Sequence, residues 1–137
     1  MIKFYPRNPV KSFQDLEIYQ KLLASCVEIV KEIQNTKPEG LISELICTPL
    51  TNYVINLPKQ IAKAHSIRFP DYPLAEKTLE DAMLNCNLTV VHLELYRDLI
   101  KTEKTVDFFN EHIKNYLTTR MKIMHLQKSW KKFNTEK

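Results

Sequence analysis

The most regular feature of the chain is a seven-residue spacing of aromatic and apolar positions in its last third. One row has members seven residues apart: Phe109, Tyr116, Ile123 and Trp130. A second row follows three residues later: His112, Thr119, Leu126 and Phe133. Such spacing is typical of a helix that presents a continuous seam to its neighbours, with a slight left-handed supercoil. It predicts a helix over about residues 105–133.

Two further segments carry more apolar positions than one core-facing stripe needs. Residues 74–101 hold two lines at helical spacing, of which the second is Leu84, Leu88, Val91, Leu95 and Leu99. Residues 12–35 also hold two lines, and Ser12 with Asp15 resembles a capping box at their start. The surplus lines predict a self-association surface, to which the 12–35 helix contributes Ile18, Leu22 and Ile29.

Residues 41–66 form the remaining predicted helix, and Pro49 and Pro58 fall inside it. An interior proline costs roughly 3 kcal/mol and usually kinks a helix, so two interpretations compete. The segment is either one bent helix or two shorter ones. Because the apolar stripe keeps its phase across both prolines, we favour the bent helix.

Short connections separate the four predicted helices, which favours antiparallel neighbours. The fold class that we expect is all-α, an antiparallel up-down four-helix bundle with a left-handed supercoil. Residues 1–11 are expected to form an extended N-terminal arm, residues 12–134 the bundle, and residues 135–137 a short tail.

Composition excludes most catalytic chemistry. The chain of 137 residues has one glycine, Gly40, so it cannot build the glycine-rich loops that cradle phosphates or dinucleotides. Its three cysteines show no CxxC spacing and its histidines no HExxH or Glu-x-x-His pairing, which favours buried reduced thiols over a metal site. We expect no catalytic residues, no metal and no cofactor. No apolar run approaches the ~18–20 residues of a membrane span, and no signal peptide is recognisable, so we expect a cytoplasmic protein.

Charge is distributed unevenly along the chain. The net charge is +4, yet residues 120–137 alone carry +5. A basic end on a nearly neutral body suggests an anionic partner. The predicted nucleic-acid-binding residues are Arg120, Lys122, Lys128, Lys131 and Lys132. Trp130 and Phe133 could stack on exposed bases, although such aromatics are also typical core or interface anchors, and the lysines could simply solvate a helix end.

Two short motifs resemble those of a known family. The segment FQDLEIYQK, residues 13–21, is similar to the opening F-x-D-L-x-x-[WY]-x-K of the bacterial four-helix-bundle proteins first noted in 23S rRNA intervening sequences. The segment LPKQIA, residues 57–62, is similar to their V-P-x-N-I-A segment, with Gln60 in place of the usual Asn. The family continues E-G, whereas this chain has Lys63 and Ala64.

Trp130 near a basic C-terminus looks more like the related accessory variability determinant (Avd) branch, whose members accompany the reverse transcriptase of diversity-generating retroelements. The resemblance implies a bundle that assembles as a ring, commonly a homopentamer. For the Avd branch it also implies a basic surface that binds RNA or DNA and contacts the polymerase. Neither branch implies catalytic residues.

Two functions therefore compete. The first is a ring-forming, non-enzymatic protein that binds nucleic acid through its basic C-terminal surface as an accessory factor of a reverse transcriptase. The second is a structural or protein-interaction bundle of the intervening-sequence type, without a nucleic-acid role of its own.

Overall fold

Four long helices make up almost all of the computed structural model, which describes residues 10–135. They are α1 (Glu17–Thr36), α3 (Thr48–Ile67), α4 (Tyr72–Ile100) and α5 (Glu103–Thr135), and the described residues include no strand. The all-α class is thereby confirmed. Most of the expected N-terminal arm, residues 1–9, and residues 136–137 of the expected tail lie outside the described residues.

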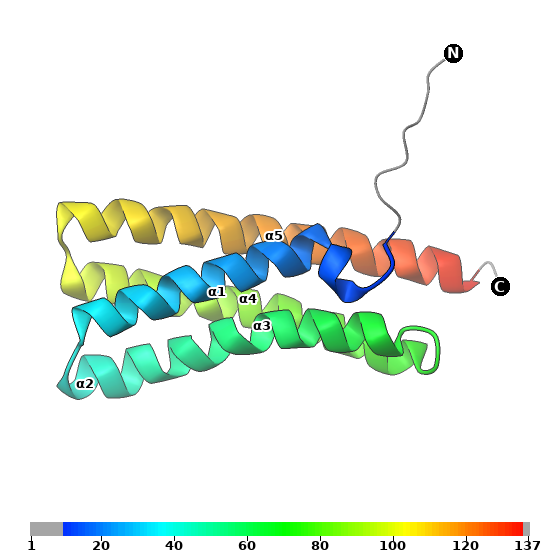
Figure 1. Ribbon diagram of the computed structural model, residues 1–137, viewed down its shortest axis with the longest axis horizontal. Coiled ribbons are helices and arrows are strands. Elements are labelled where there is room, and N and C mark those ends of the chain that lie inside the picture. Colours follow the sequence, from blue (N-terminus) through cyan, green and yellow to red (C-terminus); the bar gives the residue numbers. More distant parts are fainter. Residues whose placement is uncertain (1–9, 136–137) are drawn as a thin grey trace, which may run out of the picture.

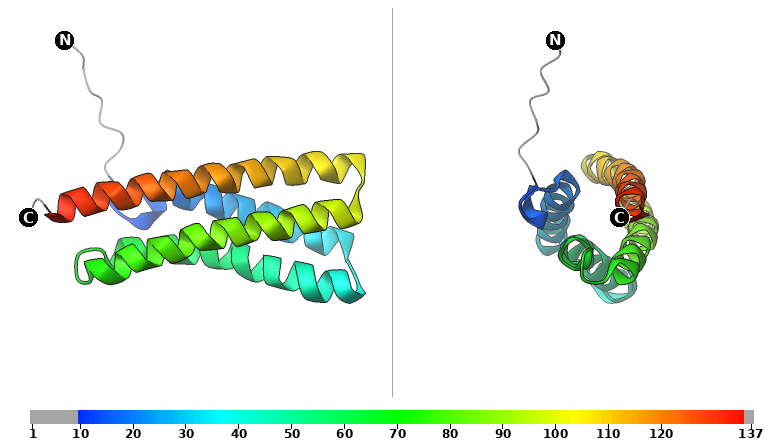
Figure 2. Two further views of the ribbon diagram at one scale, coloured as in Figure 1. Left: turned by 180° about the vertical axis from the view of Figure 1, so that it is seen from behind. Right: turned by 90° about the vertical axis from the view of Figure 1, so that its right-hand side faces the viewer.

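The chain reverses direction at each of the three connections between long helices (Figure 1). Helix α4 packs extensively against both α3 and α5, and α1 packs mainly against α3. Helices α1 and α5 complete the bundle, and they pack against each other least closely of the four neighbouring pairs. The end-on view in Figure 2 shows the wider spacing between their ribbons. No helix in residues 10–135 is both long enough and apolar enough to cross a bilayer.

The predicted start of the first helix needs correction. Ser12 and Asp15 do form a reciprocal capping box, in which Ser12 Oγ accepts from the backbone N–H of Gln14 at 3.2 Å. It caps only a single 3₁₀ turn, η1 (Phe13–Asp15). Leu16 is then extended, with φ −72° and ψ 124°, so α1 begins at Glu17. A capping box satisfies only the first turn's free N–H groups and therefore cannot ensure that the helix continues.

The segment with two prolines is helical throughout. It begins with α2 (Gly40–Ile42), passes through a π-helical turn, η2 (Ser43–Cys47), and continues as α3. At the π turn the N–H of Thr48 bonds the carbonyl of Ser43, and the wider turn leaves room for the ring of Pro49 that follows. Pro58 lies inside α3 and is buried. The helical path thus continues past both prolines, as the unbroken apolar stripe predicts.

The core is formed by apolar side chains from all four long helices. All three cysteines are buried free thiols, as expected. Ile18, Leu22 and Ile29 are also in this core, with exposed fractions of 8%, 1% and 0%. This corrects their assignment to a self-association surface. Periodicity identifies two apolar lines on α1 but cannot decide which one faces inward.

One buried amide fixes the seam between α3 and α4. Asn85 Nδ2 donates to Gln60 Oε1 at 3.0 Å and to the backbone carbonyl of Tyr53 at 3.3 Å. The hydroxyl of Thr89 donates to the carbonyl of Asn85 at 2.8 Å. The buried side-chain groups of Asn85 and Thr89 therefore have partners, as burial requires.

Candidate nucleic-acid interface

Three of the predicted basic residues are exposed together on the last turns of α5: Lys128, Lys131 and Lys132. Positions three and four apart lie on one face of a helix, so their ammonium groups share one side. Within residues 10–135 no ion pair joins any of the three to an acid. They are therefore free to contact an anion.

The other two predicted residues point elsewhere. Arg120 is partly buried beside α4, close enough to the thiol of Cys86 to oppose the burial that raises the pKa of Cys86 to about 12. Lys122 faces α1, where its Nζ lies 3.0 Å from Glu17 Oε1. Lys21 lies 3.0 Å from the same oxygen, and the two lysines together lower the pKa of Glu17 to about 2. The five predicted residues are thus not one surface.

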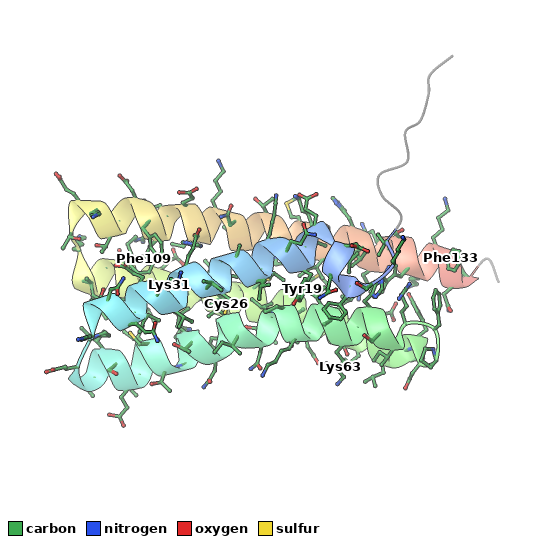
Figure 3. The ribbon with its side chains drawn as sticks, in the orientation of Figure 1. Tyr19, Cys26, Lys31, Lys63, Phe109 and Phe133 are labelled. Carbon is green, nitrogen blue, oxygen red and sulfur yellow. The ribbon has the colours of Figure 1, made fainter. Side chains whose placement is uncertain are left out.

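The two predicted aromatic residues also differ from each other. Trp130 is partly buried, and its ring centroid lies 6.2 Å from that of His65 and 5.9 Å from the guanidinium carbon of Arg68. Phe133 is 57% exposed at the end of α5, where Figure 3 labels it. Trp130 is therefore an anchor with one accessible side, whereas Phe133 presents its ring to solvent.

A surface hollow of about 260 Å³ lies between these aromatics and the α3–α4 connection. The guanidinium of Arg68 lies 4.2 Å from the ring centroid of Phe69 and donates a hydrogen bond to the carbonyl of His65. The lining thus combines aromatic rings, a cation and small polar groups: Arg68, Phe69, Tyr72, Ser129, Trp130, Phe133 and Asn134.

Residues 68–72 are the part of this site that the sequence pattern missed. The segment RFPDYP, residues 68–73, predicts a loop because of its prolines and aspartate. The one sequence feature that could have indicated a binding role is the pairing of Arg68 with the aromatic residues Phe69 and Tyr72. Loop aromatics beside an arginine are typical of binding surfaces. Only the fold brings this loop next to the last turns of α5.

Two acidic residues of α4, Glu76 and Glu80, lie against the last turns of α5 on the side that packs on α4. Gln127 Nε2 on α5 donates to the carbonyl of Glu76 at 3.2 Å, which holds the start of α4 against it. Tyr72 Oη donates to Glu76 Oε2 at 3.1 Å, and burial, helped by this carboxylate, raises the pKa of Tyr72 to about 12. An anionic chain would therefore approach the three lysines from the outer side of α5.

Such a surface can neutralise phosphates through the lysines and stack a flat ring against the aromatics of the hollow. No group of three or more potential metal ligands occurs among the residues that the structure describes. Comparison with known proteins yields no match to a protein-family model, to a curated protein or to a solved structure.

Proposed function

We propose that this chain is a nucleic-acid-binding accessory protein whose binding surface is the C-terminal part of α5. The observation that carries the proposal is the exposed, unpaired face of Lys128, Lys131 and Lys132 on the last turns of α5, whose other side lines a hollow of aromatic rings. Phosphate contacts supply affinity, and ring stacking supplies a preference for unpaired bases. The ligand that suits this pairing best is single-stranded RNA or DNA.

The family resemblance adds the finer parts of the proposal. The subunit is an antiparallel up-down bundle with a left-handed supercoil, it assembles as a ring, commonly a pentamer, and it serves a reverse transcriptase in the cytoplasm without taking part in the catalysis of nucleic-acid synthesis. An adjacent reading frame for a reverse transcriptase would support this role. Its absence would favour the alternative, a structural bundle of the intervening-sequence type.

Fluorescence anisotropy with labelled single-stranded RNA and DNA at several salt concentrations tests the binding. The variant Lys128→Glu/Lys131→Glu/Lys132→Glu is expected to abolish measurable binding at moderate salt. For each lysine that contacts a phosphate, log K should fall with log salt by about 0.7 per contact. Losing three contacts reduces that slope by about 2.

A matched triple variant keeps the change in net charge the same. Lys101, Lys104 and Lys114 are likewise exposed, and they lie toward the opposite end of α5. Their reversal to Glu should weaken binding far less. Equal losses in the two variants would mean that only net charge matters, and the assigned surface would be wrong.

A surface on α4 is a better candidate for self-association than Ile18, Leu22 and Ile29 of α1, which are buried in the core. The second apolar line of α4 is exposed along its length, to between 36% and 59%, and comprises Leu84, Leu88, Val91, Leu95 and Leu99. Isolated exposed leucines need no explanation, but a continuous stripe is typical of an interface. Light scattering should detect an oligomer that Leu88→Lys/Leu95→Lys dissociates. A monomeric wild-type protein would contradict the ring.

A further inference from the structure

A second polar cluster lies in the seam between α1 and α5, away from the C-terminal hollow. Ser25 Oγ lies 2.7 Å from His112 Nδ1, and His112 Nε2 lies 3.0 Å from Glu28 Oε2. Ser25 is 7% and His112 3% exposed, whereas the side chain of Glu28 reaches solvent. The three residues come from mid-helix positions and meet because α1 and α5 lie side by side (Figure 1).

The partners determine the direction of both hydrogen bonds. A carboxylate can only accept, so His112 Nε2 must carry a hydrogen and donate it to Glu28. Burial lowers the pKa of His112 below 6.5, which favours the neutral ring near pH 7. In a neutral imidazole the other nitrogen has no hydrogen, so His112 Nδ1 accepts from the hydroxyl of Ser25. The hydroxyl thus points its proton at a base that a carboxylate holds in orientation.

This arrangement borders a cavity that contains a further unused donor. The cavity has a volume of about 220 Å³ and is lined by Ser25, His112, Tyr116 and Thr119, with Lys21, Glu28 and Glu111 among its other residues. Tyr116 is 1% exposed, and its hydroxyl makes no hydrogen bond of good geometry among the described residues, although it lies close to the Ser25 hydroxyl. A liquid-phase water occupies about 30 Å³, so the cavity has room for a group of several heavy atoms.

A hydroxyl bonded to a base, with the base oriented by a third group, is the geometric signature of an activated nucleophile. The roles of the two imidazole nitrogens are exchanged relative to the serine protease arrangement, but the proton path is equivalent. Backbone N–H groups in the middle of a helix are already bonded, so they cannot stabilise an oxyanion. The hydroxyl of Tyr116 is the donor that could do so.

We propose that Ser25 is an activated nucleophile that takes the acyl group of a small ester into the cavity between α1 and α5. The Ser25 oxygen bonds to the acyl carbon as its proton passes to His112 Nδ1, and the bond to the alcohol oxygen breaks. The departing alcohol receives that proton. Water, deprotonated by His112, then attacks the acyl carbon, which releases the carboxylic acid and restores the Ser25 hydroxyl. Glu28 acts as a positioning residue.

The test uses the full-length protein and 4-nitrophenyl acetate, with peptide mass mapping of the acetylated sites. Acetylation should accumulate on Ser25 and be lost in Ser25→Ala. His112→Gln, which removes the base, should slow Ser25 acetylation about 100-fold or more. Ser66 is an internal control, because this helix serine only donates to the carbonyl of Ala62 at 2.7 Å. Equal labelling of Ser25 and Ser66 overturns the proposal, as does an unlabelled Ser25 in a protein that releases 4-nitrophenol no faster than Ser25→Ala.

Two further variants separate chemistry from a merely structural role. The charged groups near His112 are Glu28 and Glu111, with Lys21 also lining the cavity. Because Glu28 raises the pKa of His112, Glu28→Gln should move the acid limb of the acylation rate to lower pH, whereas a packing defect would not. If Ser25→Ala fails to fold, Ser25→Cys keeps the cluster, and its acetyl thioester should form. An unmoved pH profile, together with no acetylation at position 25 of the Ser25→Cys variant, would also overturn the proposal.

Discussion

Two of the four seams of the bundle, α3–α4 and α1–α5, treat buried polar groups differently. In the α3–α4 seam, the side-chain amide of Asn85 donates to Gln60 and to the carbonyl of Tyr53, and the hydroxyl of Thr89 donates to the backbone carbonyl of Asn85. In the α1–α5 seam, the hydroxyl of Tyr116 is buried without a hydrogen bond of good geometry among the described residues and borders a cavity of about 220 Å³. The first seam uses its polar groups to fix how two helices meet. The second leaves a polar group and space unfilled, which is the usual sign of a site.

The largest expected difference between the seams comes from apolar packing. Leu93→Ala removes a fully buried side chain of α4 and should lower the free energy of unfolding by about 2–5 kcal/mol. Leu22→Ala in α1 should fall at the low end of that range, because Leu22 already borders the cavity. Urea unfolding of both variants measures the difference. Equal losses would mean that the two seams are packed equally well.

Asn85→Ala probes the satisfied polar cluster. It leaves the side-chain oxygen of Gln60 and the backbone carbonyl of Tyr53 without their donor, which should cost about 1–3 kcal/mol of unfolding free energy. Asn87→Ala is the matched control, since Asn87 is exposed on the same helix and should cost less than about 0.5 kcal/mol. If the two variants unfold at the same urea concentration, the amide does not hold the α3–α4 seam.

The α1–α5 seam should be sensitive to mild acid. Burial lowers the pKa of His112 below its ordinary value of 6.5 in the folded protein. As pH falls below about 6.5, the unfolded chain therefore binds a proton before the folded chain does, so stability is complete above this pH and lost below it. His112→Gln should flatten part of this dependence in urea unfolding between about pH 5 and 7. His65, whose pKa burial also lowers, contributes to the remainder in the same direction. An unchanged pH dependence in His112→Gln would place the titration at another residue.

The smallest effect on stability is expected for the Tyr116 hydroxyl, the buried polar group that most distinguishes the α1–α5 seam from the α3–α4 seam. Tyr116→Phe removes a buried hydroxyl that makes no hydrogen bond of good geometry among the described residues, so the free energy of unfolding should be unchanged or slightly raised, within about 0.5 kcal/mol. Tyr96→Phe should behave alike, because its buried hydroxyl also makes no hydrogen bond of good geometry among the described residues, although it lies near Thr36 and Cys47. A loss above about 1 kcal/mol in Tyr116→Phe alone would show that this hydroxyl has a structural role. Unchanged stability with slower Ser25 acetylation would assign it to chemistry.

Much of the fold was predictable because it depends on local spacing. The four apolar stripes predicted the long helices to within a few residues, except at the start of the first. There the capping box at Ser12 was identified correctly, but it caps the turn Phe13–Asp15. The site was predicted only in part. Charge indicated the exposed lysines of α5, whereas no sequence spacing pointed to Arg68 and Phe69 as neighbours of Trp130 and Phe133.

The sequence by itself determined that this protein is helical, that its cysteines are buried and that its charge gathers near the C-terminus, since each property depends on composition or on helical period. Only the tertiary structure decided which apolar line of α1 faces inward, because two lines on one helix have the same period. It also decided that Lys122 pairs with Glu17 and that Ser25 meets His112, 87 residues further along the chain. Such contacts depend on how the helices rotate and pack against one another, and no local pattern specifies that rotation.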